Sequence, residues 1–309
     1  MLLSLVIPIF NEEENIPHLW SRLLVALKDE REVEVVFVND GSADATAAAV
    51  VALESKEHFR WKLVNLSRNF GHQSALSAGL AHATGDAIVF LDADLQDPPE
   101  LIPEFLTLFR SGYDVVYGVR KNRKESLLMR FFFSLFYRLH NLLSEHPIPA
   151  DAGEFGLMSR RVAKLLIAMP EKDRMIRCLR SWVGFRQIGV PYSRPARHSG
   201  TSRFLPWRRI EGALDGLFGY SKIPIRFAAL LGLSVIVLGF AYLAWVYTGW
   251  MFFGGQAVPG WISVISLGFI VAGTNIVVTA IVGEYACRVY FQAKSRPIFV
   301  VDSVLESPE

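Results

Sequence analysis

The chain has 309 residues, enough for one large domain or for a domain with an appendage. Hydrophobic residues make up 51% of it and the mean hydropathy is +0.29, which is high for a soluble enzyme and indicates that part of the chain lies in lipid. A net charge of only +2 gives no reason to expect nucleic acid as a partner, and two isolated cysteines, Cys178 and Cys287, argue against a disulfide framework or a zinc site.

The first half of the chain alternates short apolar runs with helical patterns. We expect strands over 3–8, 33–38, 61–66, 87–91 and 113–117, and helices over 11–27, 44–53 and 74–83. Short strands that alternate with helices predict βαβ crossovers, and therefore an α/β fold with a mostly parallel sheet. Ligands of such sheets bind beyond the carboxyl ends of the strands, so the polar clusters at those positions are site candidates.

The strongest cluster follows the fourth predicted strand and contains Asp92, Asp94 and Gln96. Two carboxylates that are two residues apart on a turning chain can both approach one hard cation, either Mg²⁺ or Mn²⁺. Such a cation would neutralise a diphosphate as it leaves. A bare Asp-x-Asp is common in loops, and it is the position after an apolar strand that favours a metal site here.

Three further polar clusters follow the other strands. Asp40 can accept hydrogen bonds from a nucleobase or a ribose, while Ser42 or Asp44 can cap the next helix. The cluster 8–13, taken by itself, indicates only the start of a helix. The loop 68–72 contains His72, which by itself is more simply interpreted as a structural histidine.

Basic residues gather at 120–130 and at 197–203. The first group precedes a Phe-rich amphipathic stretch, 127–143, which is either an interfacial membrane helix or a core helix. The group at 120–130 either holds anionic headgroups or is a solvated charge run. The Gly/Ser/Thr-containing loop 197–203 either closes over a diphosphate or is an ordinary surface loop.

A long uncharged segment dominates the last third of the chain. No Asp, Glu, Lys, Arg or His occurs between Arg226 and Glu284, and about 20 apolar residues suffice to cross a bilayer. We expect two spans, 227–247 and 262–282, joined by a turn between Trp250 and Trp261. Positive residues on both outer flanks predict that both termini are cytoplasmic. The predicted organisation is therefore a catalytic domain (1–205), a juxtamembrane amphipathic helix (206–226), two transmembrane helices (227–283) and a cytoplasmic tail (284–309), in a multi-pass protein of the inner (plasma) membrane.

Several ordered motifs resemble a known family. They are Val6-Ile7-Pro8-Ile9-Phe10-Asn11-Glu12-Glu13, Val38-Asn39-Asp40-Gly41-Ser42, Leu66-Ser67-Arg68-Asn69-Phe70-Gly71, Asp92-Ala93-Asp94-Leu95-Gln96-Asp97-Pro98-Pro99-Glu100 and Gly283-Glu284-Tyr285. Together with the two spans, they are similar to family 2 glycosyltransferases of the dolichol-phosphate mannose synthase and bactoprenol glucosyltransferase type, over nearly the whole chain. The resemblance implies a GT-A fold and inversion at the anomeric carbon.

The resemblance also implies residue roles. The metal and donor diphosphate would be held by Asp92, Asp94 and Gln96. The nucleotide pocket would be lined by Pro8, Phe10, Glu12, Asp40 and Asp92. The acceptor phosphate would be gripped by Arg120 and Arg130, and the donor would be enclosed by Arg203. The catalytic residues would be Asp94, Asp151 and Glu154, the last two by orienting the acceptor or the sugar.

One motif departs from the family pattern. Relatives usually carry Asp-Phe-Arg where this chain has Glu154-Phe155-Gly156. A longer carboxylate and a missing guanidinium reshape the sugar or acceptor site, so the identity of the sugar stays open.

The expected activity is inverting transfer of one sugar from a nucleotide-sugar to undecaprenyl or another polyprenyl phosphate. UDP-glucose is the donor that the resemblance favours; UDP-galactose, GDP-mannose and an amino sugar stay open, as does a homo-oligomeric state. One alternative is a processive polysaccharide synthase, which needs more spans and a Gln-x-x-Arg-Trp motif that the stretch at Arg180-Ser181-Trp182 does not match. The other is a non-catalytic membrane scaffold that binds a sugar-lipid.

Overall fold

The computed structural model describes residues 1–56, 58–121, 152–172, 174–193, 223–253 and 260–308. The chain divides into two compact units, one formed by 1–205 with 296–309 and the other by 206–295. The amphipathic stretch 127–143 and residues 206–222 of the predicted juxtamembrane helix lie outside the described residues.

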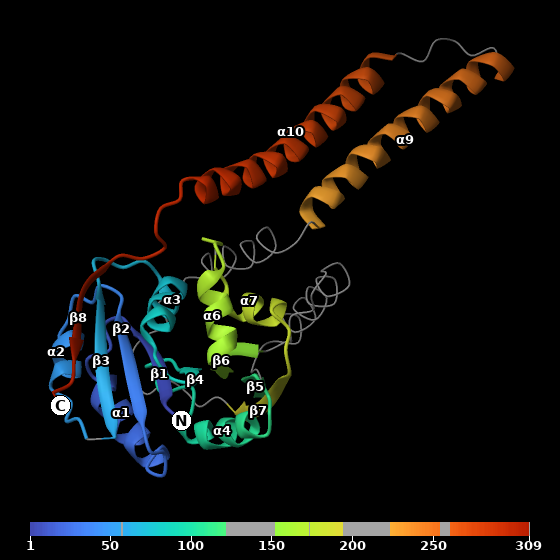
Figure 1. Ribbon diagram of the computed structural model, residues 1–309. Helices are drawn as coiled ribbons and strands as arrows, with labels where there is room; N and C mark the ends of the chain where they lie inside the picture. The colour runs from blue at the N-terminus through green and yellow to red at the C-terminus, as the bar shows by residue number, and fades with distance from the viewer. Residues whose placement is uncertain (57, 122–151, 173, 194–222, 254–259, 309) are drawn as a thin grey trace. The chain divides into compact units, whose positions relative to one another are not determined.

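The first unit is built on an eight-stranded sheet with the strand order β7-β5-β6-β4-β1-β2-β3-β8 (Figure 1). The strands are β1 (Leu3–Ile9), β2 (Val33–Asn39), β3 (Phe59–Leu66), β4 (Ala87–Phe90), β5 (Val115–Lys121), β6 (Ala152–Ser159), β7 (Gln187–Ser193) and β8 (Val301–Glu306). β1 pairs in parallel with β2 and β4, β2 with β3, and β5 with β7, whereas β6 and β8 run antiparallel to their neighbours. The predicted α/β architecture with a mostly parallel sheet is confirmed.

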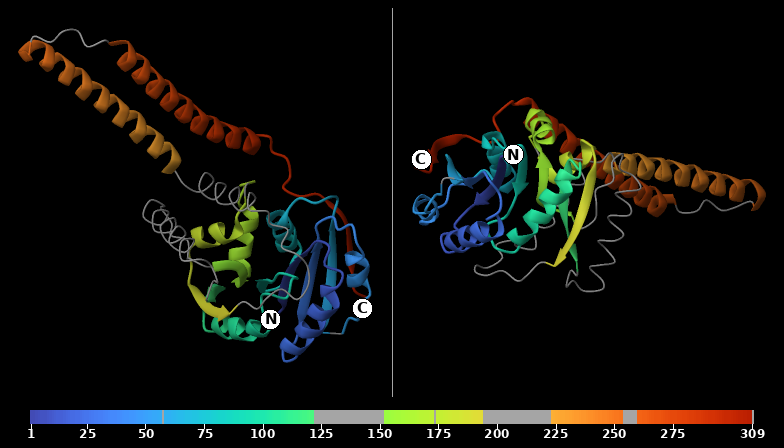
Figure 2. Two further views of the ribbon diagram at one scale, coloured as in Figure 1. Left: turned by 180° about the vertical axis from the view of Figure 1, so that it is seen from behind. Right: turned by 60° about the horizontal axis from the view of Figure 1, so that its bottom comes forward.

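Helices cover both faces of this sheet (Figure 1 and Figure 2). They are α1 (Asn15–Ala26), α2 (Thr46–Val51), α3 (His72–His82), the short η1 (Pro99–Leu101), α4 (Ile102–Arg110), α6 (Arg160–Ala168) and α7 (Ile176–Trp182). On one face, Ile16 and Leu19 of α1 join a buried cluster with Leu5 of β1. On the other face, α3 approaches so closely that a Cβ on Gly79 would lie 2.2 Å from a methyl of Val6. Because both faces are buried, the strands are almost continuously apolar rather than alternating.

The stretch 284–309, predicted as a tail, contains the end of a helix and the last strand, β8. The preceding helix continues to Ala293, and β8 then pairs antiparallel with β3 from Lys62↔Glu306 to Leu66↔Val301. Nδ2 of Asn65 donates a hydrogen bond to Oγ of Ser303 at 3.1 Å. The run 301–306 is short and half polar, so its strand conformation depends on the backbone edge that β3 offers rather than on a local pattern.

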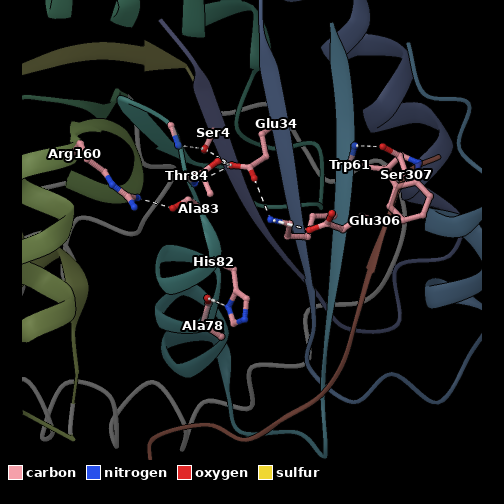
Figure 3. A network of polar contacts seen from close by, with 12 residues as sticks. Ser4, Glu34, Trp61, Ala78, His82, Ala83, Thr84, Arg160, Glu306 and Ser307 are labelled. Carbon is pink, nitrogen blue, oxygen red and sulfur yellow. Dashed lines mark hydrogen bonds and ion pairs between the residues drawn. The ribbon is translucent and has the colours of Figure 1, made fainter. Parts of the chain in front are cut away.

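A polar network around Glu34 ties four strands together at the end of the sheet where β1 and β2 begin (Figure 3). Oε2 of Glu34 accepts hydrogen bonds from Oγ of Ser4 at 2.5 Å and from the backbone and hydroxyl of Thr84 at 2.9 and 3.0 Å. Nζ of Lys62 lies 3.3 Å from Oε1 of Glu34 and 3.1 Å from Oε1 of Glu306, which brings β8 into the network. Burial opposes ionisation of Glu34, but these hydrogen bonds and the charge of Lys62 outweigh it and lower its pKa.

Replacing Glu34 with Gln is expected to lower the free energy of unfolding by about 1–3 kcal/mol at neutral pH, because the hydrogen bonds to a charged acceptor are weakened. A carboxyl whose pKa is lowered by folding stabilises the protein above its ordinary value of 4.5 and loses that effect as the pH falls through the lowered value. The deficit of Glu34→Gln should therefore begin to shrink in denaturant titrations as the pH falls below 4.5. Glu32→Gln, at an exposed position on the same segment, is the control and should change little; an equal deficit at every pH would contradict this account.

The second unit contains two long helices, α9 (Ile223–Phe253) and α10 (Gly260–Ala293). Within them, Leu230–Gly249 and Ile270–Ala293 are long and apolar enough to cross a membrane, judged by length and composition alone. Large apolar side chains such as Leu238 and Phe240 are 68% and 69% exposed, as lipid-facing residues of a span would be in the absence of lipid. The two predicted spans fall within these helices.

Candidate active site

The predicted site residues that the structure describes gather at one edge of the sheet. The carboxyl ends of β1, β2, β4 and β5 share this edge, and β6, running the opposite way, begins there. In strand order, the edge carries Arg120 on β5, Glu154 on β6, Asp92 after β4, Phe10 after β1 and Asp40 after β2. Three further predicted residues lie outside the described part of the chain: Arg130, Asp151 and Arg203.

The loops after β1 and β2 are joined by hydrogen bonds. The N–H of Asn11 donates to Oγ of Ser42 at 3.0 Å, and Oδ1 of Asn11 accepts from the N–H of Ala43 at 2.8 Å. The N–H of Glu12 donates to Oγ1 of Thr46 at 2.8 Å. Asn11 adopts φ +54°, a left-handed conformation that asparagine tolerates better than most residues. These bonds fix the backbone that follows Phe10.

Pro8 and Phe10 occupy the end of β1. Pro8 lies two residues beyond Val6, the last residue of β1 that pairs with β4, and is half-buried. Phe10 is 37% exposed. An aromatic ring at such an edge offers a stacking surface for a nucleobase, which agrees with its predicted place in a nucleotide pocket.

Asp40 holds the loop that follows β3. It is buried, and its Oδ1 and Oδ2 accept the backbone N–H groups of Phe70 at 2.7 Å and Gly71 at 2.9 Å. Burial raises the pKa of Asp40, although these two amides act in the opposite direction. Gly41 adopts φ +71°, and a Cβ there would lie 2.6 Å from the backbone nitrogen of Asn69. Each carboxylate oxygen retains a second lone pair, so a ligand can share this acceptor.

Asp40→Asn is expected to destabilise the protein by about 1–3 kcal/mol, because the amide nitrogen of Asn would face a backbone N–H. Affinity for a nucleotide should fall as well, because Asp40 is itself predicted to line the nucleotide pocket. Urea unfolding with and without added UDP measures both effects. Asp44→Asn is the control, since Asp44 is exposed and an Asn oxygen can still accept the N–H of Thr46; equal effects of both substitutions would contradict the assignment.

The loop that contains Asp92 and Asp94 is a tight turn. Asp94 is 6% exposed, and its Oδ1 accepts the N–H of Gln96 at 3.1 Å. Leu95 adopts φ +60°, which is uncommon for a residue other than glycine. Oδ1 of Asp92 lies 3.7 Å from Nε2 of His72 on α3. The sequence alone favours a structural histidine at position 72, and the structure places its ring beside the first carboxylate.

The carboxylates fit a hard divalent cation that takes its remaining ligands from a substrate. Within the described ranges, no three His, Cys, Asp or Glu side chains are grouped as a metal cage. Mg²⁺ is commonly held by only one or two carboxylates together with substrate phosphates. Asp92 and Asp94 supply oxygen ligands of that kind, which suits Mg²⁺ and Mn²⁺ rather than a thiolate-binding metal.

Glu154 is oriented from α3. Nε2 of Gln73, the second residue of this helix, donates to Oε1 of Glu154 at 3.1 Å, while Oε1 of Gln73 accepts the N–H of Ile176 at 2.9 Å. Because β6 runs antiparallel to β4 with Gly156 opposite Phe90, the register carries Glu154 towards Asp92. Oε2 of Glu154 is buried and has no hydrogen-bond partner among the described residues. A buried acceptor at this edge is suited to a donor group on a ligand.

Arg180 of α7 is a site-supporting residue that the sequence did not reveal. It is 3% exposed, and it donates to the carbonyl oxygens of Gly153 at 3.1 Å and Glu154 at 3.4 Å. Its guanidinium lies 5.1 Å from the centre of the Tyr117 ring. Burial lowers the pKa of Arg180, and the charge of Glu154 opposes that effect. A single arginine in a short helix gives no local signal, so only the fold shows that it supports the start of β6.

Position 156 accommodates only glycine in this structure. A Cβ on Gly156 would lie 2.6 Å from the carbonyl oxygen of Val116 and 2.9 Å from Cα of Tyr117. The arginine of the Asp-Phe-Arg pattern would not fit at this position, because β5 approaches the backbone of Gly156 too closely.

Arg120 lies at the end of β5, opposite Tyr192 of β7. Its Nε donates a hydrogen bond to the hydroxyl of Tyr192 at 3.3 Å. Burial acts to lower the pKa of Arg120, but Tyr192 and the charges of Asp97 and Asp92 outweigh it, so that the pKa is raised. Arg120 is thus a permanent cation at the same edge as the carboxylates.

Comparisons with known proteins show the family to which the chain is similar. Residues 4–166 match the family described as Glycosyl transferase family 2. An uncharacterized glycosyltransferase of Synechocystis, sll0501, is 38% identical over 304 residues, which are 98% of this chain and 95% of that protein. The bactoprenol glucosyl transferase of Shigella phage SfX is 38% identical over 306 residues, which are 98% of this chain and 99% of that protein. The solved structure of the mannosyltransferase PcManGT from Pyrobaculum calidifontis aligns over 95% of this chain and 75% of its own chain at 18% identity, with a TM-score of 0.46.

Proposed function

From the premise that this chain belongs to glycosyl transferase family 2, we propose that it transfers one sugar from a nucleotide-sugar to undecaprenyl or another polyprenyl phosphate, with inversion at the anomeric carbon. The mostly parallel sheet and its helices have the GT-A architecture that the resemblance implied. The observation that carries the proposal is the row of Phe10, Asp40, Asp92, Glu154 and Arg120 along one sheet edge, because it combines a nucleotide surface, a cation site and a phosphate-binding cation.

The donor we propose is UDP-glucose. The relatives named as bactoprenol glucosyl transferases support a glucosyl donor. In this proposal Pro8, Phe10 and Glu12 line the nucleotide pocket with Asp40. The loop around Asp94 and Gln96 faces the diphosphate, and Arg203 closes on the donor.

The chemistry we propose is a single displacement. The acceptor phosphate is already ionised near neutral pH, so its oxygen attacks the anomeric carbon without a strong base. Arg120 and Arg130 bind this phosphate, and Glu154 with Asp151 orients the sugar or the acceptor, so that catalysis depends on positioning and on charge stabilisation. A divalent cation, held by Asp92, Asp94 and Gln96, would neutralise the negative charge of the leaving nucleoside diphosphate.

The helices α9 and α10 provide the membrane anchor in this proposal. Their apolar stretches are long enough to span a bilayer. Lys222 and Arg226 precede the first span, whereas Arg288, Lys294 and Arg296 lie at the end of the second or beyond it. Positive residues at both outer flanks support a multi-pass protein of the inner membrane, with both termini and the active site on the cytoplasmic side.

The proposal is tested with the purified full chain, undecaprenyl phosphate and a panel of labelled nucleotide-sugars. We expect label in the organic phase with UDP-glucose, dependence on undecaprenyl phosphate, loss of transfer with a chelator, and recovery with Mg²⁺ or Mn²⁺. A long aqueous polymer would instead identify a processive synthase. Lipid binding without transfer from any donor would identify a scaffold.

A further inference from the structure

Two buried residues, Tyr192 and Asp97, connect Arg120 to the loop that carries the candidate metal ligands. Nε of Arg120 donates to the hydroxyl oxygen of Tyr192 at 3.3 Å, and that hydroxyl donates to Oδ1 of Asp97 at 2.5 Å. Tyr192 is 6% exposed and Asp97 is 1% exposed. Asp97 directly follows Gln96, so the chain of contacts runs from β5 through β7 to the turn after β4.

The direction of this chain is fixed by chemistry. A guanidinium only donates hydrogen bonds and a carboxylate only accepts them, so the hydroxyl of Tyr192 must accept from Arg120 and donate to Asp97. If Asp97 bound Arg120 directly, the two carboxylate oxygens of Asp97 would occupy two parallel N–H groups of the guanidinium. Those are the groups with which an arginine binds a phosphate, so they would no longer be available to a ligand. The tyrosine engages only Nε, and within the described part of the chain no other hydrogen bond of this guanidinium is found.

The surroundings hold Tyr192 in one position. Its ring packs against Phe155 of β6 in an edge-on contact, with centroids 5.7 Å apart. A Cβ on Gly118 of β5 would lie 2.7 Å from the ring, so a glycine is required where the ring crosses that strand. At Gly153 the fit is tight but less restrictive, because a Cβ there would lie 3.1 Å from Nη2 of Arg120. The Phe155 contact and the glycine at position 118 thus fix where the Tyr192 ring lies.

We propose that Tyr192 and Asp97 are positioning residues that aim the guanidinium of Arg120 at a phosphate group during sugar transfer. The inference rests on the proposed function. The ligand chemistry is a phosphate oxygen, which either the polyprenyl phosphate or the diphosphate of the donor can present. Tyr192 restricts the rotation of the long Arg120 side chain, and Asp97 orients the hydroxyl that does so.

Tyr192→Phe in the full chain tests this. The variant keeps the packing on Phe155 and removes only the hydroxyl. We expect the KM of one phosphate substrate to rise about tenfold while kcat changes less than about twofold, because an oriented cation mainly adds binding. A rise confined to polyprenyl phosphate identifies the acceptor phosphate, and a rise confined to the nucleotide-sugar identifies the donor diphosphate. Asp97→Asn should raise the same KM by less, since an Asn oxygen can still accept from Tyr192.

The decisive measurement is coupling with Arg120. In an Arg120→Ala background, Tyr192→Phe should cause no further change in KM, because it acts only through the missing guanidinium. Tyr113→Phe is the matched control. The Tyr113 ring centre lies 4.9 Å from the guanidinium of Arg186 rather than beside Arg120. Loss of the Tyr113 hydroxyl should therefore leave both KM values unchanged.

An equal KM rise in the presence and absence of Arg120, or a fall in thermal stability with no KM change, would overturn the inference and reduce the network to a structural role. Absence of transfer by the unsubstituted chain from every donor would instead defeat the proposed function. The two failures are therefore distinguished by the activity of the unsubstituted protein in the same assay.

Discussion

Asp94→Asn is expected to lower the rate of sugar transfer about a thousandfold while the protein stays folded. The side chain is 6% exposed and accepts the N–H of Gln96 through Oδ1, a bond that the amide oxygen of Asn can retain. The substitution therefore preserves the turn but removes the negative charge that a hard cation requires. Initial rates with labelled donor, together with a thermal unfolding curve, separate these two effects.

The control for this prediction is Asp86→Asn, which is isosteric at an exposed position just before β4. Asp86 accepts the N–H of Leu2 at 3.0 Å, and an Asn oxygen can do the same. Its activity should remain within twofold of the unsubstituted protein. Raising the Mn²⁺ concentration should partly restore Asp94→Asn if the lesion is weakened cation binding. Full activity of Asp94→Asn at low metal concentration would refute the role given to Asp94.

The parts of the site that local pattern predicts are those at the ends of the buried parallel strands. The apolar runs 3–8, 33–38 and 87–91 mark the strands, and parallel pairing brings their carboxyl ends to one edge. The clusters around Phe10, Asp40 and Asp92 follow directly from that rule. Strand periodicity and chain topology therefore suffice to bring these three clusters to one edge, whereas their roles towards a nucleotide and a metal come from the resemblance and stay predictions.

The other side of the site depends on contacts between distant segments. Tyr192 and Arg180 approach β5 and β6 only because β7 pairs with β5 and because α7 packs beside β6. Neither residue lies in a periodic or motif-like stretch, and β6 and β7 themselves were not predicted. Asp40 shows a further limit, because its sequence context predicts a ligand contact while its two oxygens also hold Phe70 and Gly71. The position of a side chain at a strand end is thus predictable, but its hydrogen-bond partners are set by the fold.

Deleting residues 300–309 is expected to destabilise the first unit by on the order of 3 kcal/mol, the net value of a few lost hydrogen bonds. The deletion removes the pairing of β8 with β3, the Asn65–Ser303 hydrogen bond and the ion pair between Lys62 and Glu306. It also leaves the backbone of β3 as an open sheet edge, which favours association between copies. Denaturant unfolding followed by fluorescence, with Trp61 of β3 4% exposed in the intact protein, measures the loss, and light scattering measures the association.

Removing only residues 308–309 is the matched control, because these residues lie beyond β8 and the ladder remains complete. An unchanged unfolding midpoint after the longer deletion would show that β8 adds nothing to the sheet. If the midpoint falls as expected, the consequence extends beyond stability. The chain leaves the first unit before α9 and re-enters it after α10, where β8 pairs with the sheet. The segment that follows α10 is therefore held to the first unit by a paired strand. Loss of β8 would then leave the site residues attached to the proposed membrane anchor by the single segment that precedes α9.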